Sequence, residues 1–170
     1  EMCIRDRILT RAQIPTPSTN SEALLWDTLA SLIERVAEND ENYDVCGVGC
    51  GGPMTGNGAS VSPLNIPAWR AFPLMKKLED ALGVPVAVDN DAKALALGEA
   101  WYGAGRTLSN FLAMVVSTGV GGGLVVDGVL LDGNDGNAGH VGHVIVEPDG
   151  ALCGCGAHGC LEAEVSGPAI

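Results

Sequence analysis

The sequence has few aromatic residues, few basic residues and no long apolar run, and each shortage excludes a class of protein. Phe, Trp and Tyr make up 4% of the 170 residues, whereas hydrophobic residues make up 46%. We therefore expect a core built from aliphatic side chains. Nine Lys and Arg residues stand against 21 Asp and Glu residues, which gives a formal net charge of −12. This balance argues against nucleic-acid binding through a basic face of this segment.

The chain also lacks the segments that direct proteins into or across membranes. A run of about eighteen apolar residues would predict a membrane span, and none is present. The first 13 residues lack the apolar core of a signal peptide, so we expect a cytoplasmic protein. They begin with Glu rather than Met and carry no clean helix or strand signal, which indicates an incomplete or mis-started sequence.

Glycine, by contrast, is abundant. The 24 glycines gather in four clusters and follow no collagen period. Between strands, such clusters mark turns where the backbone bends sharply or approaches a ligand closely. The length suits one ordinary domain or a piece of a larger one.

Helical and strand patterns alternate along the chain. Apolar residues recur at helical spacing within residues 17–39, with Ser21 as the candidate N-cap. The other predicted elements are helices from about Pro73 to Gly83 and over 92–105, strands over 43–52, 84–88 and 142–148, a β-hairpin over 110–131, and a helix after Glu162. Strands that alternate with helices predict an α/β fold with ligands at the carboxyl ends of its strands.

Three of the six cysteines fall within eight residues, at Cys153, Cys155 and Cys160. A disulfide needs an oxidising compartment, and the C-x-C pair is too close in sequence to bridge comfortably. A redox pair would usually show C-x-x-C spacing. Thiolates and a neutral imidazole are the ligands of a tetrahedral structural zinc ion, and we favour this interpretation over incidental free cysteines in a glycine-rich loop.

All three histidines of the chain lie near these cysteines. His143 begins a predicted strand and is the first candidate for the fourth ligand, while His140 and His158 are the competitors. Glycines at positions 154, 156 and 159 would let the short loop fold around one ion.

A second constellation is "VAVDNDAKALALGE", in which an apolar strand ends on Asp89, Asn90 and Asp91 before a helix. A carboxylate there could accept a proton from a substrate hydroxyl, as the general base does in phosphoryl transfer. The alternative is that Asp89 or Asp91 only caps the helix. The sequence alone leaves the two readings even.

A third constellation is the glycine-rich stretch "STGVGGG", which spans 117–123 between two apolar strands. Backbone N–H groups in such a turn can hold a phosphate, and Thr118 adds a hydroxyl. A glycine-rich hairpin without a ligand is the ordinary alternative.

Together these motifs resemble the ROK family of repressors, open reading frames and sugar kinases, over about Asp44 to Pro168. The stretches that carry the resemblance are "DND", "STGVGGGLVVDGVLLDG", "GHVGHVIVEPDG", "CGCGAHGCLE" and "GVGCGGPMTGNGASVSPLNIPAW". The resemblance implies an α/β protein with the actin-like, ribonuclease-H-like sugar kinase fold, incomplete at both ends. Residues 1–88 would be the remnant of the N-terminal α/β domain, and 89–170 the start of the C-terminal domain with its zinc loop.

The resemblance also implies roles for individual residues. Asp91 matches the catalytic base of the family. The residues that match sugar-binding positions are Asn65, Asn90, His143 and Glu162. His143 also matches a ligand of a structural zinc ion, which it would hold with Cys153, Cys155 and Cys160. The turn that receives the phosphates of ATP is matched by Thr118, Gly119, Gly121 and Gly122.

Two features depart from the family pattern. No "D-x-G-G-T" phosphate loop precedes Asp44, so we expect the chain to be the middle of a longer protein and inactive by itself. His140 stands where the family commonly has a glutamate that contacts the sugar. A neutral histidine offers one donor and one acceptor, so we expect His140 to point into the sugar pocket, alter sugar preference and leave the zinc to His143.

Three functions follow from the resemblance. The complete protein would be a kinase that phosphorylates a hexose or an N-acyl hexosamine with ATP and Mg²⁺, and a homo-oligomer. The alternatives are a sugar-responsive transcriptional repressor with an added helix-turn-helix domain, and a sugar-binding module without catalysis.

Overall fold

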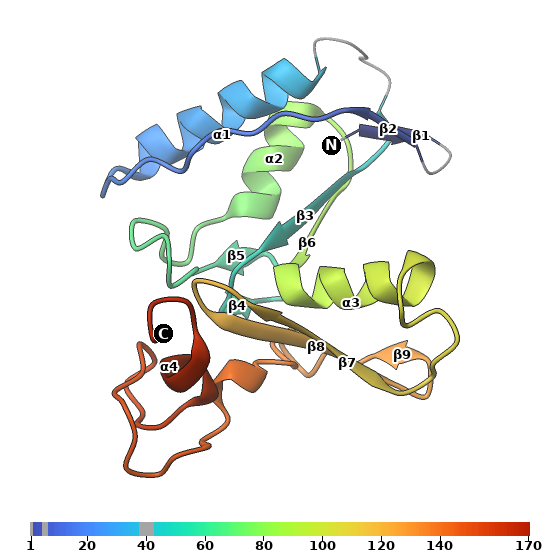
Figure 1. The fold of residues 1–170 in the computed structure, drawn as a ribbon. Helices are drawn as coiled ribbons and strands as arrows, with labels where there is room; N and C mark the ends of the chain where they lie inside the picture. Colours follow the sequence, from blue (N-terminus) through green and yellow to red (C-terminus); the bar gives the residue numbers. More distant parts are fainter. Residues whose placement is uncertain (1, 5–6, 38–42) are drawn as a thin grey trace.

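The computed structural model describes residues 2–4, 7–37 and 43–170 (Figure 1). Its helices are α1 (Glu22–Ala37), α2 (Leu74–Leu82), α3 (Asp91–Tyr102), the 3-10 turn η1 (Val141–His143) and α4 (Leu161–Val165). Its strands are β1 (Met2–Ile4), β2 (Arg7–Thr10), β3 (Cys46–Cys50), β4 (Met54–Thr55), β5 (Ser60–Val61), β6 (Val86–Asn90), β7 (Phe111–Val116), β8 (Val120–Val126) and β9 (Val129–Leu130). Among the described residues, no helix is long and apolar enough to cross a membrane.

Strands β3 and β6 form a parallel pair, with Cys46 opposite Val86 and Cys50 opposite Asn90. Parallel strands need a crossover connection, and here it contains α2, which packs against β6. Both strands therefore end at the same edge, where α3 begins directly after β6. The predicted placement of polar residues at the carboxyl end of a strand is confirmed.

Strands β7, β8 and β9 form an antiparallel sheet, in which β7 and β8 are the hairpin predicted over 110–131 and β9 is an additional third strand. The turn between β8 and β9 is Asp127–Gly128, with φ values of 50° and 78°. Positive φ at both central residues is the geometry of a two-residue hairpin, for which an Asp-Gly pair is favoured. Helix α3 lies between this sheet and the β3–β6 pair, and it packs against both (Figure 1).

The glycines of "STGVGGG" do not all belong to a turn, and this corrects the prediction. Only 117–119 connect the strands, because β8 already begins at Val120. A Cβ added to Gly123 would lie 2.5 Å from the Cβ of Ala96 on α3, and one on Gly121 would lie 3.1 Å from the Cβ of Ala92. These two glycines let α3 approach the sheet closely.

The larger core lies between α1, α2 and the β3–β6 pair. At its centre the rings of Trp69 and Phe72 stack with their centroids 4.2 Å apart, and Leu74 and Leu78 of α2 are buried beside them. The expectation of a purely aliphatic core is therefore wrong, because two of the few aromatic residues are placed together. Stacked aromatic pairs add about 0.5–1.5 kcal/mol beyond the burial of their area.

Several predicted helix boundaries are confirmed. The Ser21 hydroxyl accepts a hydrogen bond from the Leu24 N–H at 3.2 Å, so it caps α1. Gly83 ends α2 in the left-handed conformation, at φ 68°. The last two residues of the predicted 17–39 helix lie outside the described residues.

One predicted strand is wrong, and one pair of strands has no signal in the sequence. The opening segment, for which the sequence predicts neither helix nor strand, forms the antiparallel pair β1–β2. The predicted strand over 142–148 is absent: η1 is followed by a single bridge between Ile145 and Cys160. Val144, Ile145 and Val146 are all exposed, so their apolar run reflects no buried strand.

Candidate functional site

The site begins where β3 and β6 end. A Cβ on Gly49 would lie 3.3 Å from the Cα of Asp91, so the backbone of β3 passes directly beside the first residue of α3. The Asn90 side chain caps α3, since its Oδ1 accepts from the Ala92 N–H at 3.0 Å. Asp91 Oδ1 accepts from the same N–H at 2.9 Å. The cap position is thus taken by Asn90, while Asp91 is exposed at the helix N-terminus, where a negative charge is favoured.

Three of the predicted sugar-binding residues converge on the glycine pair that follows β3. A Cβ on Gly51 would lie 3.5 Å from Asn65 Oδ1, and one on Gly52 would lie 3.2 Å from His140 Nε2 and 3.6 Å from Asn90 Nδ2. Amide and imidazole groups from three distant segments therefore surround one short stretch of backbone. The fold brings Asn65, Asn90 and His140 together beside Asp91.

The loop that carries His140 is held against β4. The Asn137 side chain donates to the Met54 carbonyl at 2.8 Å and accepts from the Met54 N–H at 2.9 Å. Gly139 has a φ of 91°, and a Cβ there would lie 2.3 Å from the carbonyl oxygen of Gly122. Only glycine allows this approach, which turns the chain so that His140 faces Gly52.

Burial lowers the pKa of His140, and the neighbouring His143 and Lys93 act in the same direction, while Glu162 opposes them. His140 is therefore neutral at pH 7, and one of its ring nitrogens is a donor and the other an acceptor. The His140 and His143 rings lie edge to face with centroids 6.3 Å apart.

Glu162 joins the start of α4 to the glycine turn. Its Oε2 accepts a hydrogen bond from the Val120 N–H at 2.8 Å, and a Cβ on Gly119 would lie 2.5 Å from the same oxygen. Thr118 is exposed at the tip of this turn. The carboxylate that the sequence assigns to the sugar thus lies against the turn that it assigns to the phosphates.

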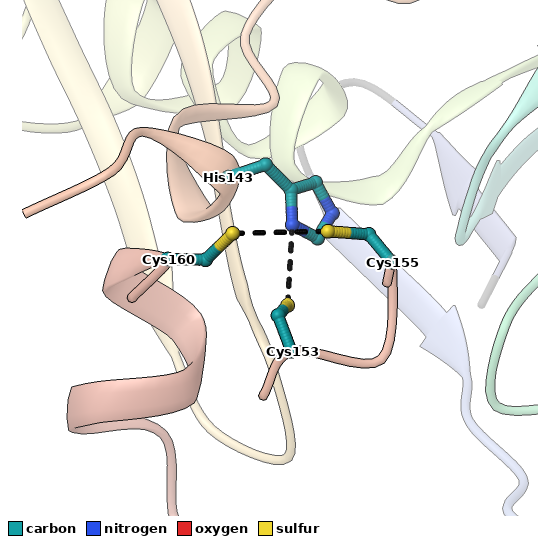
Figure 2. Close-up of side chains that lie close together, drawn as sticks. All are labelled: His143, Cys153, Cys155 and Cys160. Carbon is teal, nitrogen blue, oxygen red and sulfur yellow. Dashed lines mark hydrogen bonds between the residues drawn. The ribbon is translucent and has the colours of Figure 1, made fainter. Parts of the chain in front are cut away.

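The four predicted metal ligands lie together (Figure 2). One ligand atom from each of His143, Cys153, Cys155 and Cys160 lies within 4.8 Å of the other three. The Cys153 sulfur is 3.7 Å from His143 Nδ1, and the Cys155 and Cys160 sulfurs are 3.7 Å apart. Zinc–sulfur bonds of about 2.3 Å place the sulfurs of a tetrahedron ~3.8 Å apart, so these side chains could hold one metal ion.

Hydrogen bonds within the loop explain why these ligands meet. Cys153 N–H donates to the Ala157 carbonyl at 2.8 Å, and Gly156 N–H donates to the Cys153 carbonyl at 2.9 Å. A Cβ on Gly159 would lie 1.5 Å from the Glu147 carbonyl oxygen, so this crossing requires glycine. The loop is consequently folded tightly enough to bring Cys155 back to Cys160.

The other two histidines lie outside this cluster. His158 is exposed, and its Nδ1 is 3.1 Å from the Gly150 carbonyl.

Burial raises the pKa of Cys160 to about 12, whereas a hydrogen bond from the Ala157 backbone lowers the pKa of Cys155. A metal ion would have to displace the Cys160 proton, because only the thiolate is a ligand.

Two residues beside the site escape prediction from the sequence. Asn137 lies in a glycine-rich loop in which an asparagine indicates only a turn. Lys93 is buried within α3, although its place in an Ala-rich helix suggests an ordinary surface lysine. The one available signal was the pair of aspartates that precede Lys93.

The fold and the site define part of an actin-like, ribonuclease-H-like α/β protein of the sugar kinase type. The sequence matches the ROK family over residues 1–170, and the chain belongs to that family. It is 41% identical over 147 residues to a glucokinase of Thermotoga maritima, covering 85% of this chain and 46% of the relative. It is 37% identical over 166 residues to an N-acetylmannosamine kinase of Citrobacter koseri, covering 96% and 56%.

A solved structure of a ROK family protein also resembles this chain in fold. The ROK family glucokinase from Streptomyces griseus, in complex with glucose and AMPPNP, superposes with a TM-score of 0.85 at 36% identity, covering 96% of this chain and 51% of the other. The chain thus spans about half the length of the relatives it matches.

Proposed function

We propose that the complete protein is a sugar kinase that transfers a phosphoryl group from ATP to a hexose or an N-acyl hexosamine. The observation that carries this proposal is the convergence of Asn65, Asn90 and His140 on Gly51–Gly52, beside the exposed carboxylate of Asp91. Amide and imidazole groups suit sugar hydroxyls, since each offers both donors and acceptors. The names of the relatives, glucokinase and N-acetylmannosamine kinase, support the same substrate classes.

In this proposal Asp91 is the general base. Its carboxylate takes the proton from the sugar hydroxyl as that oxygen attacks the γ-phosphorus of ATP, the bond from this phosphorus to the β,γ-bridging oxygen breaks, and ADP leaves. The role of Asn65, Asn90 and His140, with Glu162 and His143 at the edge of the site, is to orient that hydroxyl. Mg²⁺ bound with ATP would neutralise charge on the phosphate oxygens.

The glycine turn is the proposed contact for the phosphates of ATP, with Thr118 and Gly119 at its tip. Gly121 and Gly122 lie within β8, so in this proposal they support the turn and do not form it. Glu162 already accepts a hydrogen bond from the Val120 N–H, beside the glycine turn. In this proposal the Glu162 carboxylate therefore lies between the phosphates and the sugar.

We also propose that the ion held by His143, Cys153, Cys155 and Cys160 is a structural zinc. The set of one nitrogen and three sulfurs closes a tetrahedron and leaves no position for substrate, as in structural zinc sites. A zinc ion there would fix the loop that precedes Glu162. Cysteines stay reduced in the cytoplasm, where ATP is also available, and we therefore place the protein there.

The proposed division near residue 88 falls within β6 (Val86–Asn90), so that the β3–β6 pair lies almost wholly before it and the β7–β8–β9 sheet lies after it. The support for it is that α3, which starts at Asp91, connects the two sheets (Figure 1). The proposed substrate site would then lie between the two domains, as is common for ligand sites.

The test is Asp91→Asn in the complete protein. Loss of the proton acceptor should lower kcat about a hundredfold or more and leave sugar binding largely intact. Asp80→Asn is the matched control, because Asp80 is an exposed aspartate that pairs only with the exposed Lys76 in the described structure. An Asp91→Asn variant with full activity would reduce Asp91 to a residue that only supports the helix N-terminus.

A further inference from the structure

Lys93 is a lysine whose side chain is only 1% exposed, although it lies on a helix between two sheets. A lysine ammonium has three N–H donors, and all three find acceptors here. Nζ donates to Asp89 Oδ1 at 2.7 Å, to Asp132 Oδ1, and to the Gly136 carbonyl at 3.2 Å. Charged lysines are almost never fully buried unless they are paired in this way.

The first of these contacts reaches the end of β6. The Asp89 oxygen that accepts from Lys93 also accepts from the Asn90 N–H at 2.7 Å. Asn90 in turn places its amide next to Gly52. Two hydrogen bonds that share Asp89 Oδ1 therefore connect Lys93 to the backbone of Asn90, a residue of the proposed sugar site.

The other two contacts reach the loop that leads to His140. Asp132 and Gly136 lie at the start and the middle of residues 132–140, and Asn137 fixes the same loop to Met54. The ammonium group thus joins α3 and the end of β6 to a loop that departs from the β7–β8–β9 sheet.

We propose that Lys93 is a positioning residue, which holds Asn90 at the end of β6 in register with the loop that carries His140. This proposal rests on the proposed function, because it takes the ligand between Asn90 and His140 to be a sugar. Burial lowers the pKa of Lys93, but hydrogen bonds to Asp132 and Asp89 outweigh it and the pKa is raised, so the charge persists across the neutral range.

Removal of the Lys93 ammonium would leave the carboxylates of Asp89 and Asp132 close together without the positive charge between them. Asp89 and Asp132 are 39% and 63% exposed, so water can solvate them once the lysine is gone. The expected effect is therefore a looser loop and not a collapsed fold. A displacement of about 1 Å in a binding group is enough to change turnover about a hundredfold.

The experiment compares Lys93→Met with Lys76→Met in the complete protein. Methionine keeps the length of the stem and removes the charge, and Lys76 loses an exposed pair with Asp80 in the control. Glucose and N-acetylmannosamine are the sugar probes. We expect Lys93→Met to raise the KM for the sugar about tenfold or more while the KM for ATP changes less than about twofold.

Hydrogen exchange supplies a readout that does not depend on turnover. Amides of 132–140 should exchange about tenfold faster in Lys93→Met than in wild type, with no change in Lys76→Met. Asp132→Asn should move both readouts in the same direction by a smaller factor, and it replaces Lys93→Met if that variant does not fold.

Equal loss of affinity for sugar and ATP, or unchanged exchange over 132–140, would overturn the assignment of Lys93. A wild-type protein that phosphorylates neither sugar would overturn the proposed function instead. In that case the exchange measurement still decides whether Lys93 holds the loop.

Discussion

His140 lies beside Gly52, as Asn90 does, at the position where the family resemblance implies a glutamate. A glutamate accepts hydrogen bonds only, whereas the neutral imidazole also donates one. We expect His140→Glu in the complete protein to change the ratio of the KM values for glucose and N-acetylmannosamine by about tenfold, since one matched hydrogen bond to a substrate hydroxyl has at least this effect.

The metal content should not change in this variant, and His158→Glu, at an exposed site, should leave both quantities unaltered. Loss of metal in His140→Ala, together with retention in His143→Ala, would show that the two histidines have exchanged roles.

Cys50 offers a reporter for the charge of Asp91 that is independent of catalysis. Burial, and after it the negative charge of Asp91, raise the pKa of Cys50 to about 11. At pH 8 only ~0.1% would be thiolate, compared with roughly a quarter for a free thiol of pKa 8.5. Since only the thiolate reacts, alkylation of Cys50 by iodoacetamide should be more than about a hundredfold slower than that of a free thiol.

Removal of the nearby negative charge lowers the pKa, so Asp91→Asn should accelerate alkylation of Cys50 at pH 8. Mass spectrometry of the peptide that contains Cys50 measures the rate, and Asp80→Asn is the control. An equal rate in wild type and Asp91→Asn would place the Asp91 carboxylate away from Cys50.

At the scale of elements, local signals predict what local forces decide. Ser21 caps α1 and Gly83 ends α2 as predicted, because each acts on backbone groups within one turn of itself. The strand predicted over 142–148 fails because a run of apolar residues indicates a strand only when a partner strand buries it. The sequence predicts a turn at Gly121 and Gly123, because it does not reveal that α3 packs on these two glycines.

The cysteine loop is the element whose stability should depend on metal. We expect protein purified without added metal to contain close to one zinc ion per chain by elemental analysis. Because structural zinc contributes folding free energy directly, a chelator should lower the melting temperature by at least several degrees.

The variant Cys155→Ser distinguishes a zinc ligand from an incidental exposed cysteine. Cys155 is exposed, so in a metal-free loop serine would change the stability little. As a zinc ligand, its loss should abolish stoichiometric zinc and reproduce the effect of the chelator, while Cys46→Ser leaves the zinc content unchanged. Full zinc binding by Cys155→Ser would remove this residue from the ligand set.

For the whole molecule, the sequence predicts which residue types the site needs and does not predict how they meet. Asn65, Asn90 and His140 belong to three segments, and only the tertiary fold places them around Gly51–Gly52. The metal cluster is easier to predict, since three of its four ligands lie within eight residues. The burial of Lys93 has no local cause: its acceptors are Asp89 on one side and a loop about forty positions further along the chain on the other.

The length of the relatives leads to a prediction for the 170 residues as a unit. They span 46% of the Thermotoga maritima glucokinase and 51% of the Streptomyces griseus enzyme. Phosphoryl transfer depends almost entirely on positioning and on charge stabilisation around the phosphates. In the described residues the glycine turn is the proposed phosphate contact, and the N–H group of Val120, which directly follows the turn, already donates to Glu162.

We therefore expect this chain, expressed alone, to release ADP from ATP at the background rate, with or without glucose. A coupled assay of ADP release, run beside the complete protein at equal concentration, measures this. Sugar-dependent release by the 170 residues at a rate near that of the complete protein would mean that the phosphate site lies wholly within them.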